Sequence, residues 1–442
     1  MTYTHCRSNR RPFAALRLPA LTLALTLALA LGLPGAARPQ GIADSLTLGG
    51  IYAALDTGTP RIQAAAATAR AASERIGPAR RPPDPQLQLG LMNRELPGLG
   101  LSDPLGMNQI QLMQMIPIGG KLGLAADVER ARTAAATARV DEVRWEERSR
   151  SAMAFFELYA ADRSILITSE SRRLLRGVIG TAAAMYAVGD ARQADVLRAQ
   201  VELARMTEEI VRMEAMRDAA AARLNALLDR PATSPVPPTA EPAWPAALPD
   251  NDSLLALALA RRPMLRAGAQ SVRAAAAGER LAGREIWPDL QVGVQYGWRG
   301  MEDGTEHMLS LMLGASLPIW AGSRQRAMRR EAAAMRDMAS ADLAAMEADT
   351  RGRIGEVAAT VERGQRLRAL YAGTILPQAR TTAASAMTAY QVGGVDFMTL
   401  LDAQMNVNRY RQAAVTAAAE LGQAVAELEM LTAMPLLDGG VR

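Results

Sequence analysis

The segment "LQVGVQYGW", Leu290 to Trp298, alternates large apolar side chains with polar or small ones. After a loop, the segment from Leu309 to Leu317 alternates in the same way, with apolar residues set against serine, methionine and glycine. Successive side chains of a β-strand point to opposite faces. We therefore predict two antiparallel strands that share one apolar face and one polar or small face.

A second pair of such segments lies nearer the N-terminus. Gln86 to Leu91 alternates glutamine or glycine with leucine, and Gln109 to Ile116 alternates glutamine with isoleucine or leucine, except that Met113 and Met115 blur the pattern. Strands of about ten residues can cross a bilayer at a tilt, with their polar face towards a water-filled lumen. The pattern equally fits two amphipathic hairpins packed on a soluble body.

Four strands are too few to close a barrel, and open sheet edges are not tolerated in lipid. If the strands span a membrane, several chains must therefore pool them. Three chains would supply twelve strands.

The whole chain reads as one unit repeated in tandem. "YAVGDARQADVLRAQ" from Tyr186 and "YQVGGVDFMTLLDAQ" from Tyr390 are identical at six of 15 positions and start 204 residues apart. Other matched segments show offsets between 201 and 208 residues. We expect a signal peptide and two repeats joined by a proline-rich linker and followed by a short tail, with bounds 1–37, 38–229, 230–251, 252–436 and 437–442.

Each repeat is expected to be mainly helical. A short helix (about 60–80 and 263–285) precedes the strands, and a long one (about 122–185 and 324–389) follows them, the second interrupted at Pro377. A turn and a helix of about 40 residues close each repeat. Alanine-rich helices of this length suit close-packed coiled coils. The linker contains seven prolines in 21 residues, so it is predicted to be extended and to lie on the outside of the body.

The N-terminus has the features of an export signal. Arginines precede an apolar run from Leu18 to Leu33, and small residues follow near Ala37. We interpret this as a secretory signal peptide, with a single-span anchor as the alternative. The only cysteine, Cys6, precedes the run, so it cannot be a lipidated residue after cleavage. The net charge of +5 is dispersed among acidic residues and indicates solvated helix faces without a nucleic-acid patch.

Taken together, these segments resemble the bacterial outer-membrane efflux ducts of the TolC family. The resemblance rests on the doubled strand–strand–helix–turn–helix unit, on the boundary motif at Pro117–Gly120 and Pro318–Gly322, and on the "Y-x-V-G…L-x-A-Q" turn. It implies a mainly helical fold with membrane β-structure: a homotrimer whose twelve strands form one outer-membrane barrel continued by a periplasmic α-helical barrel. The run "GMNQIQLMQMIPIGGKLGL" from Gly106 looks most like the branch found with heavy-metal efflux systems.

The resemblance also implies partners and a location. A periplasmic adaptor protein, an inner-membrane pump of the resistance-nodulation-division type and outer-membrane lipid are the expected partners, and no nucleic acid is expected. The chain would then be a passive duct that carries out no reaction of its own. Drug export and type I protein secretion are the alternatives. A periplasmic coiled-coil scaffold is the alternative from another class.

We expect no enzyme and no cofactor, because the sequence holds no catalytic constellation. His307, beside acidic residues in the expected loop of the second hairpin, is a weak metal candidate. Most methionines fall at helical spacing and are expected to pack, as at Met328, Met335, Met338 and Met346. Met113 and Met115 are the weak candidates for a soft-metal contact if they face the lumen.

The two turns carry the remaining candidates. Gly189 and Gly393 are expected in the left-handed conformation that glycine adopts at low cost. In the family these turns form the rim where the adaptor docks, so Val188 and Val392 would offer apolar contacts there.

By the same resemblance, Asp402 would contribute to a ring of three carboxylates that gates the periplasmic aperture. A second acid of the family is replaced by Thr399, and the first repeat has Arg198 at the place of Asp402. Asp195 matches a position that latches the closed state, but its basic partner is replaced by Val395, which puts that latch in doubt.

Overall fold

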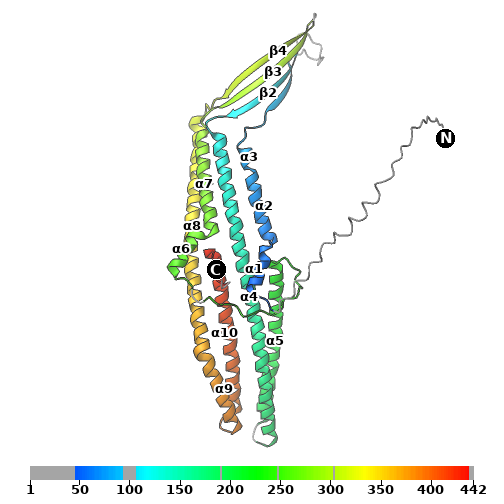
Figure 1. The fold of residues 1–442 in the computed structure, drawn as a ribbon, viewed down its shortest axis with the longest axis vertical. Coiled ribbons are helices and arrows are strands. Elements are labelled where there is room, and N and C mark those ends of the chain that lie inside the picture. Colours follow the sequence, from blue (N-terminus) through cyan, green and yellow to red (C-terminus); the bar gives the residue numbers. More distant parts are fainter. Residues whose placement is uncertain (1–44, 93–105, 190–191, 246–247, 302–303, 438–442) are drawn as a thin grey trace, which may run out of the picture. The chain divides into compact units, whose positions relative to one another are not determined.

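The structure is a computed structural model that describes residues 45–437 except 93–105, 190–191, 246–247 and 302–303. The predicted signal peptide lies outside the described residues, as does most of the predicted tail. The described residues belong to one compact unit, which begins at Ser45. Within this unit the sheet lies at one end of the long helices and the two helix–turn–helix connections lie at the other (Figure 1).

The sheet has the order β1-β2-β3-β4 and is antiparallel throughout. Its strands are β1 (Gln86–Met92), β2 (Met107–Pro117), β3 (Asp289–Met301) and β4 (Gly304–Ser316). The four strand predictions are therefore confirmed. The pairing also joins the two halves of the chain, because β2 of the first half lies beside β3 of the second.

The described residues of the first half form five helices. They are α1 (Leu48–Asp56), α2 (Pro60–Glu74), α3 (Ile76–Ala79), α4 (Lys121–Ala187) and α5 (Gln193–Leu227). At about 1.5 Å per residue the 67 residues of α4 extend ~100 Å. The predicted uninterrupted helix is thus confirmed.

Among the described residues the second half follows a similar order, with π-helical turns before and within its long helix. Its helical segments are α6 (Asn251–Arg261), α7 (Pro263–Arg284), the π-helical turn η1 (Ala321–Gln325), α8 (Arg326–Leu370), the π-helical turn η2 (Tyr371–Ile375), α9 (Leu376–Gln391) and α10 (Phe397–Thr432). The interruption predicted at Pro377 is confirmed, since the π-helical turn η2 separates α8 from α9 just before this proline. Proline lacks the backbone donor and crowds the preceding turn, so the chain widens to π-helical bonding just before it.

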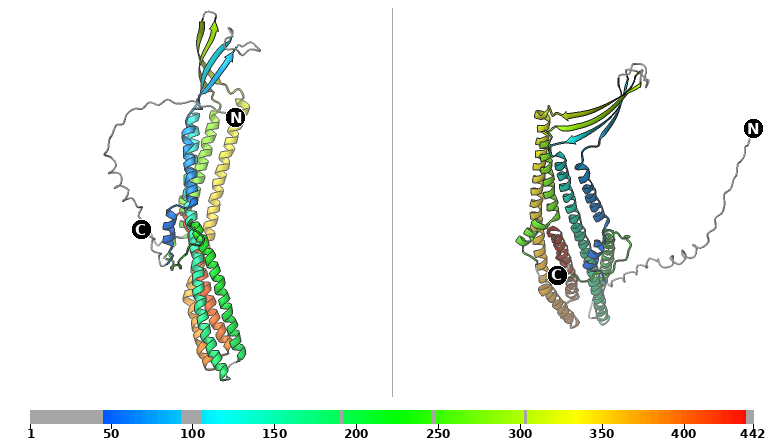
Figure 2. Two further views of the ribbon diagram at one scale, coloured as in Figure 1. Left: turned by 90° about the vertical axis from the view of Figure 1, so that its right-hand side faces the viewer. Right: turned by 45° about the horizontal axis from the view of Figure 1, so that its top comes forward.

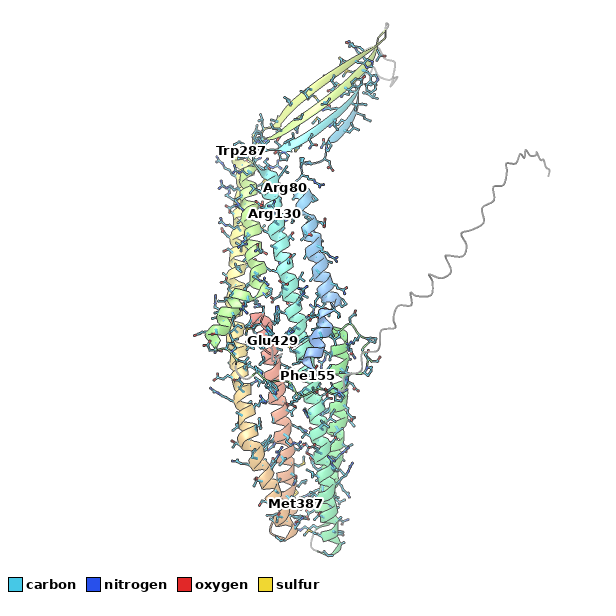
Figure 3. The ribbon with its side chains drawn as sticks, viewed as in Figure 1. Arg80, Arg130, Phe155, Trp287, Met387 and Glu429 are labelled. Atoms are coloured by element: carbon cyan, nitrogen blue, oxygen red, sulfur yellow. The ribbon has the colours of Figure 1, made fainter. Side chains whose placement is uncertain are left out.

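The long helices run side by side (Figure 2), and in the described residues two apolar clusters hold them together, one around Phe155 and one near Met387 (Figure 3). The larger lies at mid-length, where Phe155 and Phe156 of α4 pack edge to face with ring centroids 5.4 Å apart. Gly422 of α10 lies directly against Phe156, and a Cβ built there would be 2.2 Å from Phe156 Cε1. The smaller cluster joins α4, α5, α9 and α10 near the turns. Small residues therefore allow α10 to approach α4 closely.

Lys121 joins the sheet to the helices, and it is the only lysine in the sequence. It is the first residue of α4, directly after Gly119 and Gly120, which both have positive φ. The buried ammonium donates to the Trp287 carbonyl at 2.9 Å and to Asp289 Oδ1 at 2.8 Å. It also lies 3.5 Å from Glu285 Oε2. One cation thus ties α4 to the end of α7 and the start of β3.

The proline-rich segment is non-helical where described, as predicted, and side chains of α4 bind it. Tyr159 of α4 donates to both carboxylate oxygens of Glu241, at 2.9 and 3.0 Å, and burial with this hydrogen bond raises the pKa of Tyr159 to about 12. Thr239 donates its backbone N–H and its hydroxyl to Asp162 Oδ2, at 2.8 and 2.9 Å. Side chains of α4 therefore fix the path of this segment.

Candidate functional site

The sheet presents two faces of opposite character. On one face, Leu87, Leu112, Val294 and Leu311 form a row across all four strands, and on the other face the neighbouring row is Gln88, Gln111, Gln295 and Ser310. The β4 leucines of the first face, Leu309, Leu311 and Leu313, are 75%, 70% and 77% exposed in this single chain. We refer to these two faces as the leucine face and the glutamine face.

The pairing places Met113 and Met115 on the glutamine face, because they alternate with Leu112 and Ile116. Gln114 is the residue that departs from the pattern: it lies on the leucine face, where its amide donates to the Pro83 carbonyl at 2.7 Å. The two methionines are therefore apolar side chains on the face that also carries glutamine, glycine and serine, and this is how they blur the alternation.

His307 lies within β4, opposite Trp298, so its predicted position in the hairpin loop is wrong. Pairing of the strands continues as far as Met301 and Gly304. The His307 ring stacks on Tyr296 with an interplanar angle of 16°, and Nδ1 lies 2.7 Å from the tyrosine hydroxyl. These contacts use one ring nitrogen, and His307 lies on the leucine face with Tyr296 and Trp298.

In the described residues, no group of three or more histidine, cysteine, aspartate or glutamate side chains is arranged to hold a metal ion. A search of the same residues finds no helix with both the length and the apolar character needed to cross a bilayer.

The far end of the helices is formed by the two turns. Gly189 and Gly393 have φ values of +89° and +74°, so the predicted left-handed conformation is confirmed at both. Val188 and Val392 are 73% and 79% exposed. Each turn therefore presents a valine to its surroundings beside a glycine that reverses the chain.

The N-terminus of α10 is capped by the side chain of Asp396. Asp396 accepts a hydrogen bond from the Thr399 backbone N–H at 2.9 Å and a second one from the Thr399 hydroxyl. These bonds, with the charge of Arg192, hold the pKa of Asp396 below its usual range. Thr399 is thus engaged in capping the helix, while Asp402 one turn further is exposed.

Tyr390 is a residue of this end that the sequence interpretation missed. It is 5% exposed, it packs edge to face on Phe397, and its hydroxyl has no hydrogen-bond partner among the described residues. Burial and then the nearby carboxylate of Asp195 raise the pKa of the Tyr390 hydroxyl. The half-buried carboxylate of Asp195 in the first half of the chain therefore disfavours ionisation of Tyr390 in the second half. The basic residue expected beside Asp195 is replaced by Val395.

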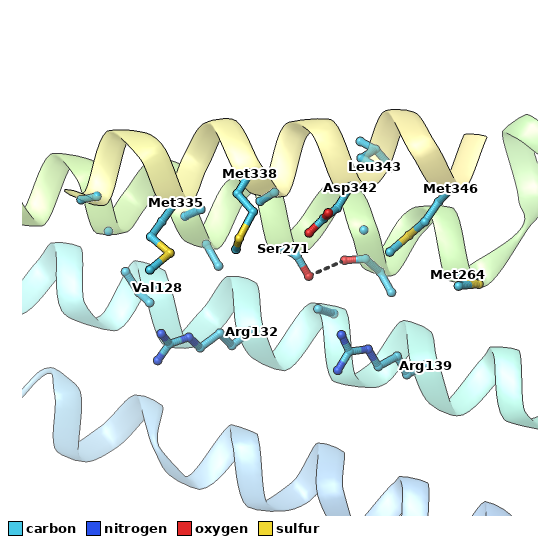
Figure 4. Close-up of a pocket in the computed structure, with 18 of the residues that line it drawn as sticks. Val128, Arg132, Arg139, Met264, Ser271, Met335, Met338, Asp342, Leu343 and Met346 are labelled. Carbon is cyan, nitrogen blue, oxygen red and sulfur yellow. Dashed lines mark hydrogen bonds between the residues drawn. The ribbon is translucent and has the colours of Figure 1, made fainter. Parts of the chain in front are cut away.

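A groove of about 1030 Å³ lies over α7 between α4 and α8 (Figure 4). Small residues of α7 such as Gly268 and Ser271 line it, together with Met328, Met335, Met338 and Met346 of α8. Met335 and Met338 are exposed in the single chain, so any packing role for them requires a neighbouring chain.

A sheet with one leucine face and one glutamine face, joined to long paired helices, is the make-up of a membrane-channel subunit. The sequence model of the outer membrane efflux protein family matches residues 52–230 and 254–433, so the chain belongs to that family. The resemblance to the TolC-type channels noted from the sequence is thereby confirmed.

Solved outer-membrane channels share the fold. The chain is similar to the channel OprN (20% identity, 88% of this chain and 90% of that chain, TM-score 0.73). It is also similar to CusC (14% identity, 88% and 93%, TM-score 0.76) and to VceC from Vibrio cholerae (16% identity, 88% and 96%, TM-score 0.73). No curated protein sequence matches the chain. At these identities the structures establish the fold alone.

Proposed function

We propose that the chain is the exit duct of a tripartite efflux system, in which three copies form one passive channel through the outer membrane and the periplasm. The observation that carries this proposal is the exposed leucine face of the sheet. Large side chains exposed in a row cost free energy in water and gain it against lipid. The glutamine face on the other side suits a lumen filled with water.

The edges of the sheet support a closed ring of copies, and three is the number that the family resemblance implies. In the described residues β1 and β4 each pair with one neighbour only, so each has one free edge. Unpaired backbone groups are expensive in lipid, and joining β4 of one copy to β1 of the next removes both edges. Twelve strands in a closed barrel result, and the helices below them would form a tube in the periplasm.

The family model matches the chain twice, which supports a tandem duplication of one ancestral unit. A matching contact occurs in both halves. Arg61 Nη1 donates to Glu147 of α4 at 2.9 Å, and Arg262 Nη1 donates to Thr350 of α8 at 2.8 Å. Both contacts fasten the start of a short helix (α2 or α7) to the long helix of the same half.

The turns with Val188 and Val392 are the proposed docking rim for a periplasmic adaptor, itself coupled to an inner-membrane pump of the resistance-nodulation-division type. The exposure of the two valines and the left-handed conformation of Gly189 and Gly393 support this assignment. Heavy-metal cations are the proposed cargo, on the likeness of the run from Gly106 to the heavy-metal branch. Export of drugs or of protein remains the outcome to test against it.

At the turn end, the proposed gate is formed by Asp402 with Thr399 and Asp195. Threefold symmetry would bring three exposed Asp402 carboxylates together, and such a ring would attract cations and narrow the aperture. Asp195 would act through Tyr390, which lies beside it.

The duct itself is tested by the mass and the conductance of the purified full chain. Native mass measurement in detergent is expected to give three copies, and reconstitution in a planar bilayer is expected to give discrete channels. A soluble monomer or dimer without conductance would instead support a periplasmic scaffold.

For the gate we expect Asp402→Ala to raise single-channel conductance and to weaken block by divalent cations. Arg198→Ala is the matched control, since Arg198 occupies the equivalent place after the first turn. Unchanged conductance together with unchanged cation block in Asp402→Ala would remove Asp402 from the gate.

A further inference from the structure

The methionines of the sheet are not distributed evenly between its two faces. Six methionine side chains are described on the strands: Met92, Met107, Met113, Met115, Met308 and Met312. The pairing places all six on the glutamine face. The leucine face carries leucine, isoleucine, valine, tyrosine and tryptophan but none of these methionines.

Two of the methionines converge on one point of that face. Met113, Gly293 and Met312 form a single row across β2, β3 and β4. A Cβ built on Gly293 would lie 3.1 Å from Met113 Cγ and 3.3 Å from Met312 Cε. The two thioether side chains therefore approach each other above the glycine. Met113 Cγ and Met312 Cε are no farther apart than the sum of these two distances.

A second glycine of β3 is covered in the same manner. A Cβ on Gly297 would lie 3.1 Å from Met107 Sδ. Between the two glycines, the amide of Gln295 donates to Gln109, and the amide of Gln111 donates to Met113 Sδ. Around the two glycines the glutamine face thus presents thioethers and amides in neighbouring rows.

Packing alone does not explain this choice of side chain. Leucine fills a similar volume, and the same four strands use it repeatedly on the opposite face. Methionine differs from leucine mainly by its polarisable sulfur, whose lone pairs bind soft metal ions such as copper(I).

We propose that the glutamine face carries a binding site for a soft monovalent cation, copper(I) or silver(I), centred on the thioethers of Met113 and Met312. That this face lines the exit path rests on the proposed function, whereas the binding itself does not. Two neutral sulfur ligands give a weak site. Weak binding suits a conduction path, since an ion must leave as readily as it enters.

The test uses silver(I) and the purified full chain in detergent, in chloride-free buffer, with bound silver measured by equilibrium dialysis. We expect the double variant Met113→Leu/Met312→Leu to lose tenfold or more in affinity at the tightest class of sites. The matched control Met335→Leu/Met338→Leu removes two exposed methionines of α8 and is expected to keep that class of sites.

A second variant tests whether the approach of Met113 and Met312 matters, and not only the number of sulfur atoms. Gly293→Ala leaves every methionine in place but inserts a methyl group where the two side chains meet, so it is also expected to weaken silver binding. Gly300→Ala in the same strand is its control, because a Cβ there meets nothing within 4 Å.

The proposal is overturned if silver binding by the double variant matches that of the unaltered chain. It is equally overturned if an apolar dye binds the glutamine face of the unaltered chain and of the double variant alike, while silver binding is the same in both. The methionines would then be an apolar lining. Conductance without silver tests the duct separately. If the chain binds silver through Met113 and Met312 but does not conduct ions, the proposed function is wrong and the binding site stands.

Discussion

Gly422 sets the separation of α4 and α10 by lacking a side chain. Because a Cβ at this position would overlap the Phe156 ring, Gly422→Ala must displace the ring or the helix. Overpacking of this kind costs about 1–3 kcal/mol. We expect a lower thermal unfolding midpoint, followed by circular dichroism.

The control for this variant is Gly355→Ala in α8, where a Cβ meets nothing within 4 Å. That change is expected to be neutral or slightly stabilising, because alanine favours helix. Adding Phe156→Leu to Gly422→Ala is expected to recover part of the loss. No recovery would mean that the clash is not the cause.

Tyr159 makes part of the stability depend on alkaline pH. Its pKa is raised to about 12, chiefly by burial and then by the hydrogen bond to Glu241, whereas tyrosine in an unfolded chain ionises near pH 10. A raised pKa gives a stabilising contribution that is complete below pH 10 and is lost as the pH rises through about 12.

Tyr159→Phe is therefore expected to lower the free energy of unfolding by about 1–2 kcal/mol at pH 8, through loss of the hydrogen bond. The difference between the two proteins is expected to shrink between pH 10 and 12. Chemical denaturation at both ends of this range measures it, and a difference independent of pH would contradict the assignment.

At the scale of elements, the turn after α9 depends on the left-handed conformation of Gly393. Gly393→Ala places a Cβ in that conformation at a cost of about 1–2 kcal/mol. We expect amide hydrogen exchange in residues 389–400 to become about fivefold faster or more, since 1 kcal/mol corresponds to about that factor. Gly352→Ala, in a regular part of α8, is expected to leave exchange at the turn unchanged.

Elements with a clear period were predictable from sequence. The strand from Leu290 and the helix from Lys121 are long and regular, so side-chain alternation and the absence of proline sufficed. The short helices α1 and α6 were missed because nine and eleven residues carry little periodic signal.

Features that depend on contacts between elements were not predictable. The row formed by Met113, Gly293 and Met312 depends on the pairing of β2, β3 and β4, which the alternation within one strand does not give. The electrostatic effect of Asp195 on Tyr390 involves residues that lie 195 positions apart in the sequence. The glycines and exposed valines of the turns, by contrast, could be placed from the duplicated motif alone.

At the scale of the whole molecule, the two faces of the sheet predict opposite responses to charge. Leu311 and Ser310 are neighbours in β4, but they point to opposite faces. An arginine on a lipid-exposed face costs about 2–4 kcal/mol near the middle of a bilayer. We expect Leu311→Arg to reduce strongly the amount of chain recovered in outer-membrane fractions.

Ser310→Arg is the matched control, because the same side chain would then face the proposed lumen. It is expected to leave membrane recovery unchanged and to alter ion selectivity in the bilayer. Equal recovery of both variants would argue against a leucine face in contact with lipid.

The single lysine of the sequence makes the junction of sheet and helices chemically addressable. Apart from the α-amino group, the chain offers one primary amine to acylating reagents, and Lys121 holds that amine buried between Asp289 and the Trp287 carbonyl. Acylation at Lys121 therefore requires that α4 separate from β3. The rate of modification at this one site would report how often the junction opens, without a label introduced into the protein.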